Sequence, residues 1–204
     1  EVKSSLLVKK GTTFAVWESL LKEYDVKEVF FNKDYEPYAL QRDTVICELL
    51  EKKNAVAYSF KDQVIFEEKE ITKADGLPYT VYTPFKNKWL EKYKTMAPVV
   101  EYDSAATFSN LYKSDFIFPT LEQIGFQKSA IKVKDHNLKF ISNYQDIRDF
   151  PALDQTSYLS PHLRFGTVSI RKLVNWAFHK NDVFLSELIW RHISMQILFC
   201  FSNV

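Results

Sequence analysis

Glycine is scarce in this sequence, with 4 residues in 204, and neither the Gly-x-Gly-x-x-Gly pattern nor the Walker pattern occurs. The usual glycine-rich loops that bind dinucleotides and phosphates are therefore excluded. Cysteine is limited to Cys47 and Cys200, which lie in apolar helical contexts without Cys-x-x-Cys or histidine-ligand spacing. We expect buried free thiols in a reducing compartment and no metal site.

Excess charge of either sign is also missing, because 27 Lys and Arg residues face 26 Asp and Glu residues and leave a formal net charge of +1. Nucleic acid therefore has no global attraction to the chain, and any such site is a local patch. No uninterrupted apolar stretch approaches the length of a membrane span, and the first residues show no signal peptide. The sequence predicts a soluble intracellular protein with no membrane partner.

Aromatic residues, in contrast, make up 16% of the chain, which favours a large packed interior or aromatic pockets. The first residue is not Met, and the sequence stops directly after an apolar helical pattern without a glycine or a basic last turn. We therefore expect a chain that is cut at both ends.

Strand and helix patterns alternate over residues 5–58. Strands are expected at 5–9, 28–31 and 55–58, with helices at 14–24 and 37–53 between them. Such alternation predicts parallel strands joined by crossover helices, as in the second half of a doubly wound domain.

Turn signals dominate the next stretch, residues 59–150, which we interpret as a long connection between two domains. It holds one short helix at about 86–94, with Thr83 as its cap and Pro84 at its first position. From residue 150 the pattern is helical, most clearly at 167–179 and 182–201.

The helix expected at 182–201 is unusual because it is apolar nearly all round, which predicts burial, yet carries Glu187, Trp190, Arg191 and Ser194 on one face. One interpretation is an ion pair between Glu187 and Arg191 at i,i+4, with Trp190 filling core space. The other is a pocket wall that offers an aromatic face and a carboxylate to a planar ligand. This segment alone leaves both open.

Hydroxyl side chains gather upstream, at Thr156, Ser157 and Ser160, where Ser160 and Pro161 resemble an N-cap and a first helical residue. Hydroxyls at a helix N-terminus form an anion site, because free N–H groups and the helix dipole point at the ligand. The alternative is simple capping. Three nearby arginines favour phosphate: Arg148, Arg164 and Arg171.

Taken in order, these segments resemble the DNA photolyase and cryptochrome family. The resemblance rests on Arg-Asp-Phe-Pro at 148–151, Thr-Ser-x-Leu-Ser-Pro-x-Leu-x-Phe-Gly at 156–166, Glu-Leu-Ile-Trp-Arg at 187–191, residues 31–43, and residues 79–85 with Lys86 and Trp89 after them. It implies an α/β fold followed by an all-α fold. The parts are a partial doubly wound parallel-sheet antenna domain at 1–60, a long interdomain linker at 61–125 and a partial helical FAD-binding domain at 126–204.

The resemblance also implies roles for residues at matching positions. Glu187 and Trp190 match the catalytic residues that receive a flipped pyrimidine dimer, Glu187 by hydrogen bonding and Trp190 by stacking. Residues that match FAD-binding positions are Tyr144, Thr156, Ser157, Tyr158, Leu159, Ser160 and Phe184, the last standing where many members have Trp. Residues that match DNA-binding positions are Arg148, Glu187, Trp190, Arg191 and Ser194.

The function that the resemblance implies is light-driven repair of cyclobutane pyrimidine dimers in DNA by electron transfer from reduced FAD, which is a carbon–carbon lyase activity. The implied partner is damaged DNA with a flipped dimer, bound by a monomer in the cytoplasm at the nucleoid. The family's flavin domain continues past the Glu-Leu-Ile-Trp-Arg helix, so this chain alone is expected to bind FAD poorly and to repair nothing. The alternatives are a cryptochrome-type blue-light receptor without repair activity and a plain interaction module.

Two departures from the family concern the same helix. Many members continue with Glu-Phe-Tyr, whereas this chain has His192, Ile193 and Ser194. His192 faces away from Glu187, which favours a partly exposed or core histidine. Ser194 replaces an aromatic residue on the pocket face and leaves the lesion type open.

The antenna region departs as well, because Tyr38 and Ala39 stand where folate-binding photolyases have an Asn-Glu pair. A folate chromophore is not supported, and the second chromophore stays unknown. The polar residues around this position are interpreted as a loop-to-helix junction tied by an arginine and carboxylates: Asn32, Asp34, Arg42 and Asp43.

Overall fold

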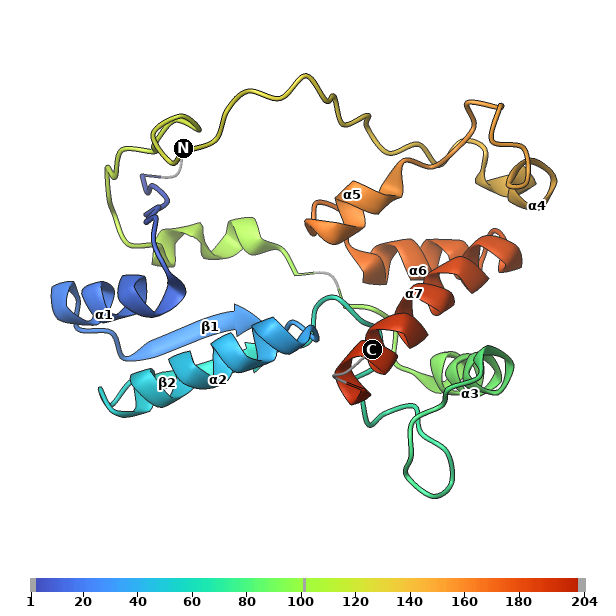
Figure 1. The fold of residues 1–204 in the computed structure, drawn as a ribbon, viewed down its shortest axis with the longest axis horizontal. Coiled ribbons are helices and arrows are strands. Elements are labelled where there is room, and N and C mark those ends of the chain that lie inside the picture. The colour runs from blue at the N-terminus through green and yellow to red at the C-terminus, as the bar shows by residue number, and fades with distance from the viewer. Residues whose placement is uncertain (1–2, 101, 202–204) are drawn as a thin grey trace. The chain divides into compact units, whose positions relative to one another are not determined.

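The computed structural model describes residues 3–100 and 102–201 (Figure 1). The chain divides into two compact units. The first unit combines Glu1–Val26 with Val100–Lys132 and contains α1 (Thr13–Glu23) and the 3-10 helix η1 (Ser104–Asn110). The second combines Lys27–Val99 with Val133–Val204 and contains the other elements. This division groups residues differently from the segments 1–60, 61–125 and 126–204, so that domain assignment stays a prediction.

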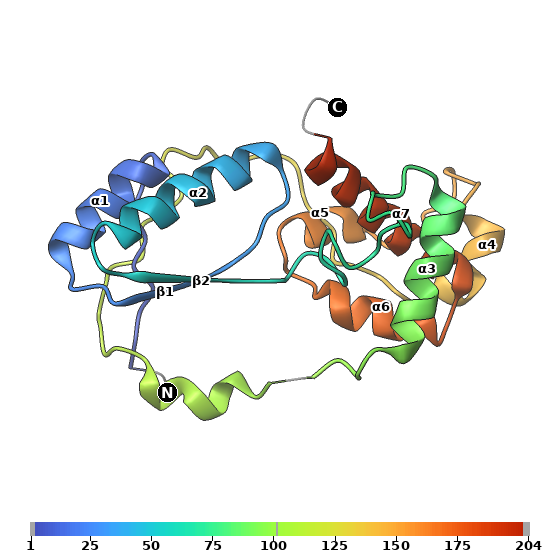
Figure 2. The same ribbon diagram turned by 90° about the horizontal axis from the view of Figure 1, so that it is seen from below.

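A small parallel sheet lies in the second unit. Its two strands, β1 (Glu28–Asn32) and β2 (Val56–Phe60), pair from Glu28 with Val56 to Asn32 with Phe60. The connection between them is α2 (Pro37–Glu51), which runs along one face of the sheet (Figure 2). The α/β part of the predicted fold is confirmed, including the parallel strand direction.

The loop that leads into α2 is held by its own polar side chains. Asp34 Oδ1 accepts hydrogen bonds from the backbone N–H groups of Tyr35, at 2.7 Å, and Glu36, at 3.3 Å. Arg42 Nε donates to Asp43 Oδ1 at 2.7 Å, and Asn32 donates to Asp62 Oδ2 at 3.1 Å. These contacts agree with the junction interpretation of the four polar residues.

The rest of the second unit is helical, which confirms the second half of the predicted fold. Its elements are α3 (Tyr82–Thr95), the 3-10 helix η2 (Ile141–Asn143), α4 (Tyr144–Ile147), α5 (Leu159–Arg164), α6 (Ile170–Phe178) and α7 (Asp182–Cys200). The longest of them, α7, packs against both α3 and α6.

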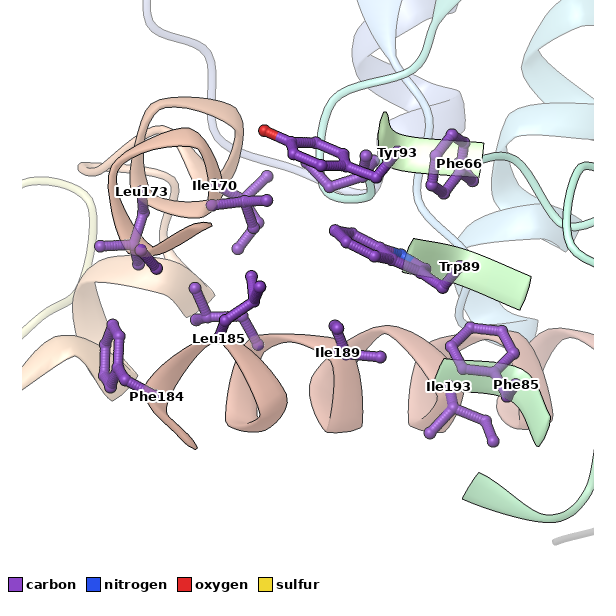
Figure 3. Close-up of a cluster of buried hydrophobic side chains, with 14 of the residues drawn as sticks. Phe66, Phe85, Trp89, Tyr93, Ile170, Leu173, Phe184, Leu185, Ile189 and Ile193 are labelled. Atoms are coloured by element: carbon purple, nitrogen blue, oxygen red, sulfur yellow. The ribbon is translucent and has the colours of Figure 1, made fainter. Parts of the chain in front are cut away.

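The core of this helical region forms where α3, α6 and α7 meet (Figure 3). Phe85 and Trp89 of α3 face Ile189 and Ile193 of α7, and all four side chains are at most 1% exposed. Burying each such side chain contributes roughly 1.5–3 kcal/mol. This cluster therefore fixes the position of α7 against α3 and α6. The opposite face of α7 carries Glu187 and Trp190.

One histidine is part of this core. His192 is 6% exposed; Trp89 Nε1 donates to its Nδ1 at 2.8 Å, and its Nε2 lies 2.9 Å from the carbonyl oxygen of Phe66. Because Nδ1 accepts, the proton must sit on Nε2, which donates to Phe66. Burial lowers the pKa of His192 to about 4, so the ring is neutral at pH 7. The prediction of a core histidine is confirmed.

The strand expected at residues 5–9 is wrong, because these residues are irregular in the structure. The backbone N–H of Ser5 donates to Ser114 Oγ at 3.1 Å, and the two hydroxyl oxygens lie 3.0 Å apart. A strand requires a neighbouring strand to pair its backbone groups. Residues 5–9 have the composition of a strand, but the backbone of Ser5 bonds to the side chain of Ser114 instead.

The beginning of α3 also differs from the prediction. The helix starts at Tyr82, and its N-cap is Val81, which makes no side-chain cap bond. Thr83 and Pro84 therefore lie within the first turn rather than at the cap. A proline is tolerated there because the first four N–H groups of a helix have no partner within it.

The cysteine prediction is partly wrong. Cys47 is half-buried, whereas Cys200, the last residue of α7, is exposed; both are free. The apolar pattern around Cys200 predicted burial, but the helix leaves its core at this end.

By length and composition alone, one helix among the described residues, α7, could cross a membrane, with 19 residues and an 18-residue window of mean hydropathy 1.2. The expectation that no uninterrupted apolar stretch approaches that length is not contradicted, because Glu187 and Arg191 interrupt the apolar pattern of α7. Length and composition do not distinguish a spanning helix from a core helix. In the structure α7 contributes seven buried residues to the helical region.

Replacing Asn181 with alanine should lower the free energy of unfolding by about 1–2 kcal/mol. Its Oδ1 accepts from the backbone N–H of Phe184 at 2.8 Å and caps α7, while its Nδ2 donates to Ser142 O and to Gln145 Oε1. Urea denaturation measures the change. Asn181→Asp keeps the cap oxygen and should recover about half of the loss, whereas an alanine variant as stable as the parent would contradict the capping role.

Candidate functional site

The largest concentration of predicted site residues surrounds one cavity of about 480 Å³ in the second unit. Its walls come from α4, α5 and α7, together with three loop segments: the one before α2, the one after β2 and the one before α5. Seven of the residues predicted from the sequence line it: Tyr144, Ser157, Leu159, Ser160, Phe184, Glu187 and Arg191. Segments that lie some forty residues apart in the sequence thus meet at one site.

Aromatic rings form one side of the cavity. Phe184, at the start of α7, is 4% exposed and contacts Tyr144 of α4 edge to face, with ring centroids 5.2 Å apart. Burial raises the pKa of the Tyr144 hydroxyl, with a smaller contribution from the Glu187 carboxylate. Two rings at right angles give this wall a fixed apolar surface suited to a planar ligand.

The hydroxyl segment enters the cavity differently from the prediction. α5 begins at Leu159, and its N-cap is Tyr158 in the left-handed conformation with φ 53°. Ser160 and Pro161 are therefore helical residues, not the cap and first position. The prediction missed this because a left-handed residue other than glycine is uncommon and leaves no composition signal.

Tyr158 and Thr156 do not line the cavity, although both were predicted to bind the cofactor. Thr156 is exposed, whereas the Tyr158 hydroxyl accepts from Lys134 Nζ at 2.7 Å. Lys134 also binds Asp154 at 3.0 Å, and Asn137 N–H donates to Ser157 O at 2.9 Å. The irregular segment that carries Lys134 and Asn137 thus contacts residues on both sides of Tyr158 as well as Tyr158 itself.

The carboxylate of Glu187 pairs with Arg148 rather than with Arg191. Arg148 Nη1 donates to Glu187 Oε1 at 2.5 Å, which ties α7 to the C-cap of α4. This hydrogen bond raises the pKa of the Arg148 guanidinium. The i,i+4 ion pair considered from the sequence is therefore wrong, because a partner 39 residues away competes better for the same carboxylate.

Arg191 is bound elsewhere. Its Nη1 donates to the carbonyl oxygen of Gln63 at 2.7 Å, and burial lowers its pKa with a further contribution from nearby Arg164. Arg164 itself pairs with Glu36. Arg191 thus places a half-buried positive charge at the cavity wall. It forms no ion pair with Glu187 of its own helix, which pairs with Arg148.

Trp190 lies on the exposed face of α7, outside the cavity lining. It is 47% exposed, and its indole stacks on Tyr82 of α3 with ring centroids 3.9 Å apart and an angle of 5° between the planes. Ser194, one turn further, is exposed and donates to the carbonyl oxygen of Trp190 at 2.9 Å. The expectation of a buried carboxylate beside a buried indole is wrong, because only the opposite face of α7 meets the core.

Sequence reasoning missed several residues of the cavity wall. Tyr35 and Glu36 line it, and they stand in the segment 31–43 that carried part of the family resemblance, so a signal for them existed. Gln63, Met195 and Leu198 also line it, with no distinguishing pattern. Among residues 3–100 and 102–201, no group of three or more His, Cys, Asp or Glu side chains is arranged to hold a metal ion.

Comparison with known proteins finds similarity to DNA photolyases. A sequence model of the DNA photolyase family matches residues 1–102, half of the chain. The chain is 30% identical over 230 residues to the deoxyribodipyrimidine photo-lyase of Halobacterium salinarum, which covers 100% of this chain and 48% of that protein. The enzyme of the same name from Vibrio cholerae is 27% identical over 200 residues, covering 88% of this chain and 43% of that one. The chain therefore spans about half the length of these relatives.

Solved structures share the fold. A class III photolyase from Agrobacterium tumefaciens aligns with a TM-score of 0.66 at 22% identity, over 99% of this chain and 47% of that one. An archaeal photolyase from Sulfolobus tokodaii, solved with two FAD molecules, aligns with a TM-score of 0.62 at 19% identity, over 91% of this chain and 42% of that one. At these identities the likeness supports the α/β part followed by the helical part.

Proposed function

Because the chain belongs to the DNA photolyase family, we propose that the full-length protein containing it repairs cyclobutane pyrimidine dimers in DNA by light-driven electron transfer from reduced FAD. Full-length protein here means a protein of the relatives' length that includes these residues. The single observation that carries the proposal is the convergence of seven predicted residues on one cavity. The relatives are named for the lyase activity, so the receptor alternative gains no support from them.

The residues of the cavity fit part of an FAD site. Ser157 and Ser160 bring hydroxyls, and Tyr144 and Phe184 bring apolar ring surface, which together suit a phosphorylated planar cofactor. Thr156 and Tyr158 belong to the same proposed set through their position in the segment that leads into α5. When bound and excited by light, reduced FAD supplies the electron that splits the cyclobutane ring.

The proposed lesion site lies on the outer face of α7. A dimer is too bulky to react inside a duplex, so it must be flipped out and held. Trp190 stacks on the flipped lesion, and Glu187 hydrogen-bonds one of its bases. That hydrogen bond is proposed to stabilise the charge that develops on the lesion, and Arg148, which is bound to Glu187 at 2.5 Å, is proposed to contact the DNA. Arg191 and Ser194 complete the proposed DNA contacts.

The remaining parts of the proposal follow the family. Residues 1–60 form part of the antenna domain, 61–125 the linker and 126–204 part of the FAD-binding domain. The protein acts as a monomer in the cytoplasm, at the nucleoid where its substrate lies. No second chromophore is assigned, and Tyr38 and Ala39 give no support for folate.

The deciding experiment illuminates the full-length protein, loaded with reduced FAD, in the presence of DNA that contains cyclobutane thymine dimers. Recovery of thymine that depends on blue light is the expected result. A dark sample and a sample without flavin are the controls. No light-dependent recovery despite bound reduced FAD would reject the proposal.

The chain alone is expected to bind FAD weakly and to repair nothing, because it spans about half the length of its relatives and lines the cavity from α4, α5, α7 and three loop segments. Fewer contacts hold the ligand, so less binding energy offsets the cost of ordering it. Absorbance titration of the purified 204-residue chain measures this. Tight one-to-one binding of FAD would sink the prediction.

A further inference from the structure

The segment at the start of α3 contacts α7 directly beneath the proposed lesion face. Residues 79–85 were singled out in the sequence, but neither the cavity nor the proposed reaction assigns them a role. Tyr82 stacks flat on Trp190, and its hydroxyl donates to the carbonyl oxygen of Ser186 at 2.9 Å. One turn later, Lys86 Nζ donates to Ser186 Oγ at 2.6 Å. Three contacts from two α3 residues therefore meet one turn of α7.

We propose that Tyr82 is a positioning residue that fixes the plane of the Trp190 indole for stacking on the flipped lesion. This inference rests on the proposed function, since it assigns Trp190 its ligand. Tyr82 itself does not touch the lesion in this proposal. The Tyr82 ring covers one face of the indole. The exposed surface of Trp190 is therefore its other face and its edges.

The geometry supports positioning because an exposed side chain otherwise changes rotamer on the picosecond to nanosecond timescale. An indole that is 47% exposed lacks the surrounding atoms that hold a core side chain in one orientation. A parallel ring at 3.9 Å restricts rotation out of the stacking plane. The indole loses its conformational entropy during folding rather than when the ligand binds. Preorganised sites gain affinity in this way.

The phenol is itself held at both ends. Tyr82 is half-buried and packs against the core cluster, and burial raises the pKa of its hydroxyl. The neutral hydroxyl keeps its donated hydrogen bond to Ser186, one residue before Glu187. The same contact thus ties the turn that carries the proposed carboxylate and the turn that carries the proposed indole to α3.

The test separates ring stacking from the hydroxyl bond with two variants, Tyr82→Phe and Tyr82→Leu. In the 204-residue chain, nanosecond fluorescence anisotropy of Trp190, obtained by subtracting the Trp190→Phe signal, reports indole mobility. Tyr82→Leu should add a fast component that Tyr82→Phe lacks. An indole equally immobile in Tyr82→Leu would overturn the proposal. Far-UV circular dichroism identifies a variant that fails to fold. In that case a second pair is used: Tyr82→His keeps a flat ring, and Tyr82→Met does not.

The second readout is lesion discrimination by the full-length protein, measured as the ratio of its affinities for an oligonucleotide with one thymine dimer and for its undamaged match. Tyr82→Leu should lower this ratio about 3- to 10-fold, the range of an aromatic pair, while Tyr82→Phe stays within about twofold. In a Trp190→Ala background Tyr82→Leu should have no further effect. An undiminished effect in that background would overturn the proposal.

The two readouts distinguish failure of this inference from failure of the proposed function. If the unsubstituted protein shows no preference for the dimer, the proposed function fails and the lesion-stacking role fails with it. If the preference is present but Tyr82→Leu leaves both the indole mobility and the discrimination ratio unchanged, the proposed function stands and Tyr82 is only a packing residue.

Discussion

Substitution of Trp190 by alanine should weaken the binding of dimer-containing DNA to the full-length protein by about one to two orders of magnitude. Stacking of a base on an aromatic side chain contributes roughly 1–3 kcal/mol, and Trp190 is the exposed ring on the outer face of α7. Binding of undamaged DNA should change little, because phosphate contacts dominate it. Fluorescence anisotropy of labelled oligonucleotides with and without one thymine dimer measures both affinities.

The matched control is Tyr102→Ala, which removes an 85% exposed aromatic side chain of the first unit that has no proposed role. It should leave both affinities unchanged. Trp190→Phe retains a smaller ring and should lose less affinity than the alanine variant. An equal loss for damaged and undamaged DNA in Trp190→Ala would show that the indole contributes to general DNA contact and not to lesion recognition.

Acid should destabilise the helical region by about 3 kcal/mol between pH 6.5 and pH 4 through His192 alone. The folded-state pKa of His192 is lowered to about 4 by burial, below the ordinary value of 6.5 that applies in the unfolded chain. As the pH falls below 6.5, His192 binds a proton in the unfolded state but not in the folded state. The free energy of unfolding is therefore highest above pH 6.5 and declines toward pH 4. A difference of about 2.5 pKa units corresponds to about 3 kcal/mol.

Urea denaturation at a series of pH values measures this slope. His192→Gln removes the titrating ring. It should be less stable than the parent at pH 7, because Trp89 Nε1–H loses the imidazole nitrogen as its acceptor, but it should show a flatter pH dependence. His179→Gln, which removes an exposed histidine of the same unit, should keep the steep slope. A parent and a His192→Gln variant with parallel pH profiles would refute the assignment.

The two longest helices of the second unit, α7 and α2, were predictable from the sequence because their signals are local. The pattern at 182–201 gave α7 within one residue, and that at 37–53 gave α2 within two. The failures share a different cause. Residues 5–9 have a strand composition, but strand formation depends on a neighbour that no local pattern reveals.

The site shows the same division. The residue types at Ser157 and Glu187 indicated a site, the family resemblance added Phe184, and the structure brings all three to one cavity. The partners were not predictable: Glu187 pairs with a residue 39 positions away, and Trp190 stacks on Tyr82, more than one hundred positions upstream. Helical spacing offers only neighbours within the same helix, so it proposed Arg191 for Glu187.

The hydrogen bond from Trp89 to His192 has a consequence for the order of events during synthesis. The two residues are 103 positions apart, so α3 emerges from the ribosome long before α7. At about 5–20 residues per second, the apolar face of α3 waits roughly 5–20 seconds for the helix that covers it. During this interval Phe85 and Trp89 have no native cover from α7, and exposed hydrophobic surface of this kind makes a partly folded chain prone to aggregation.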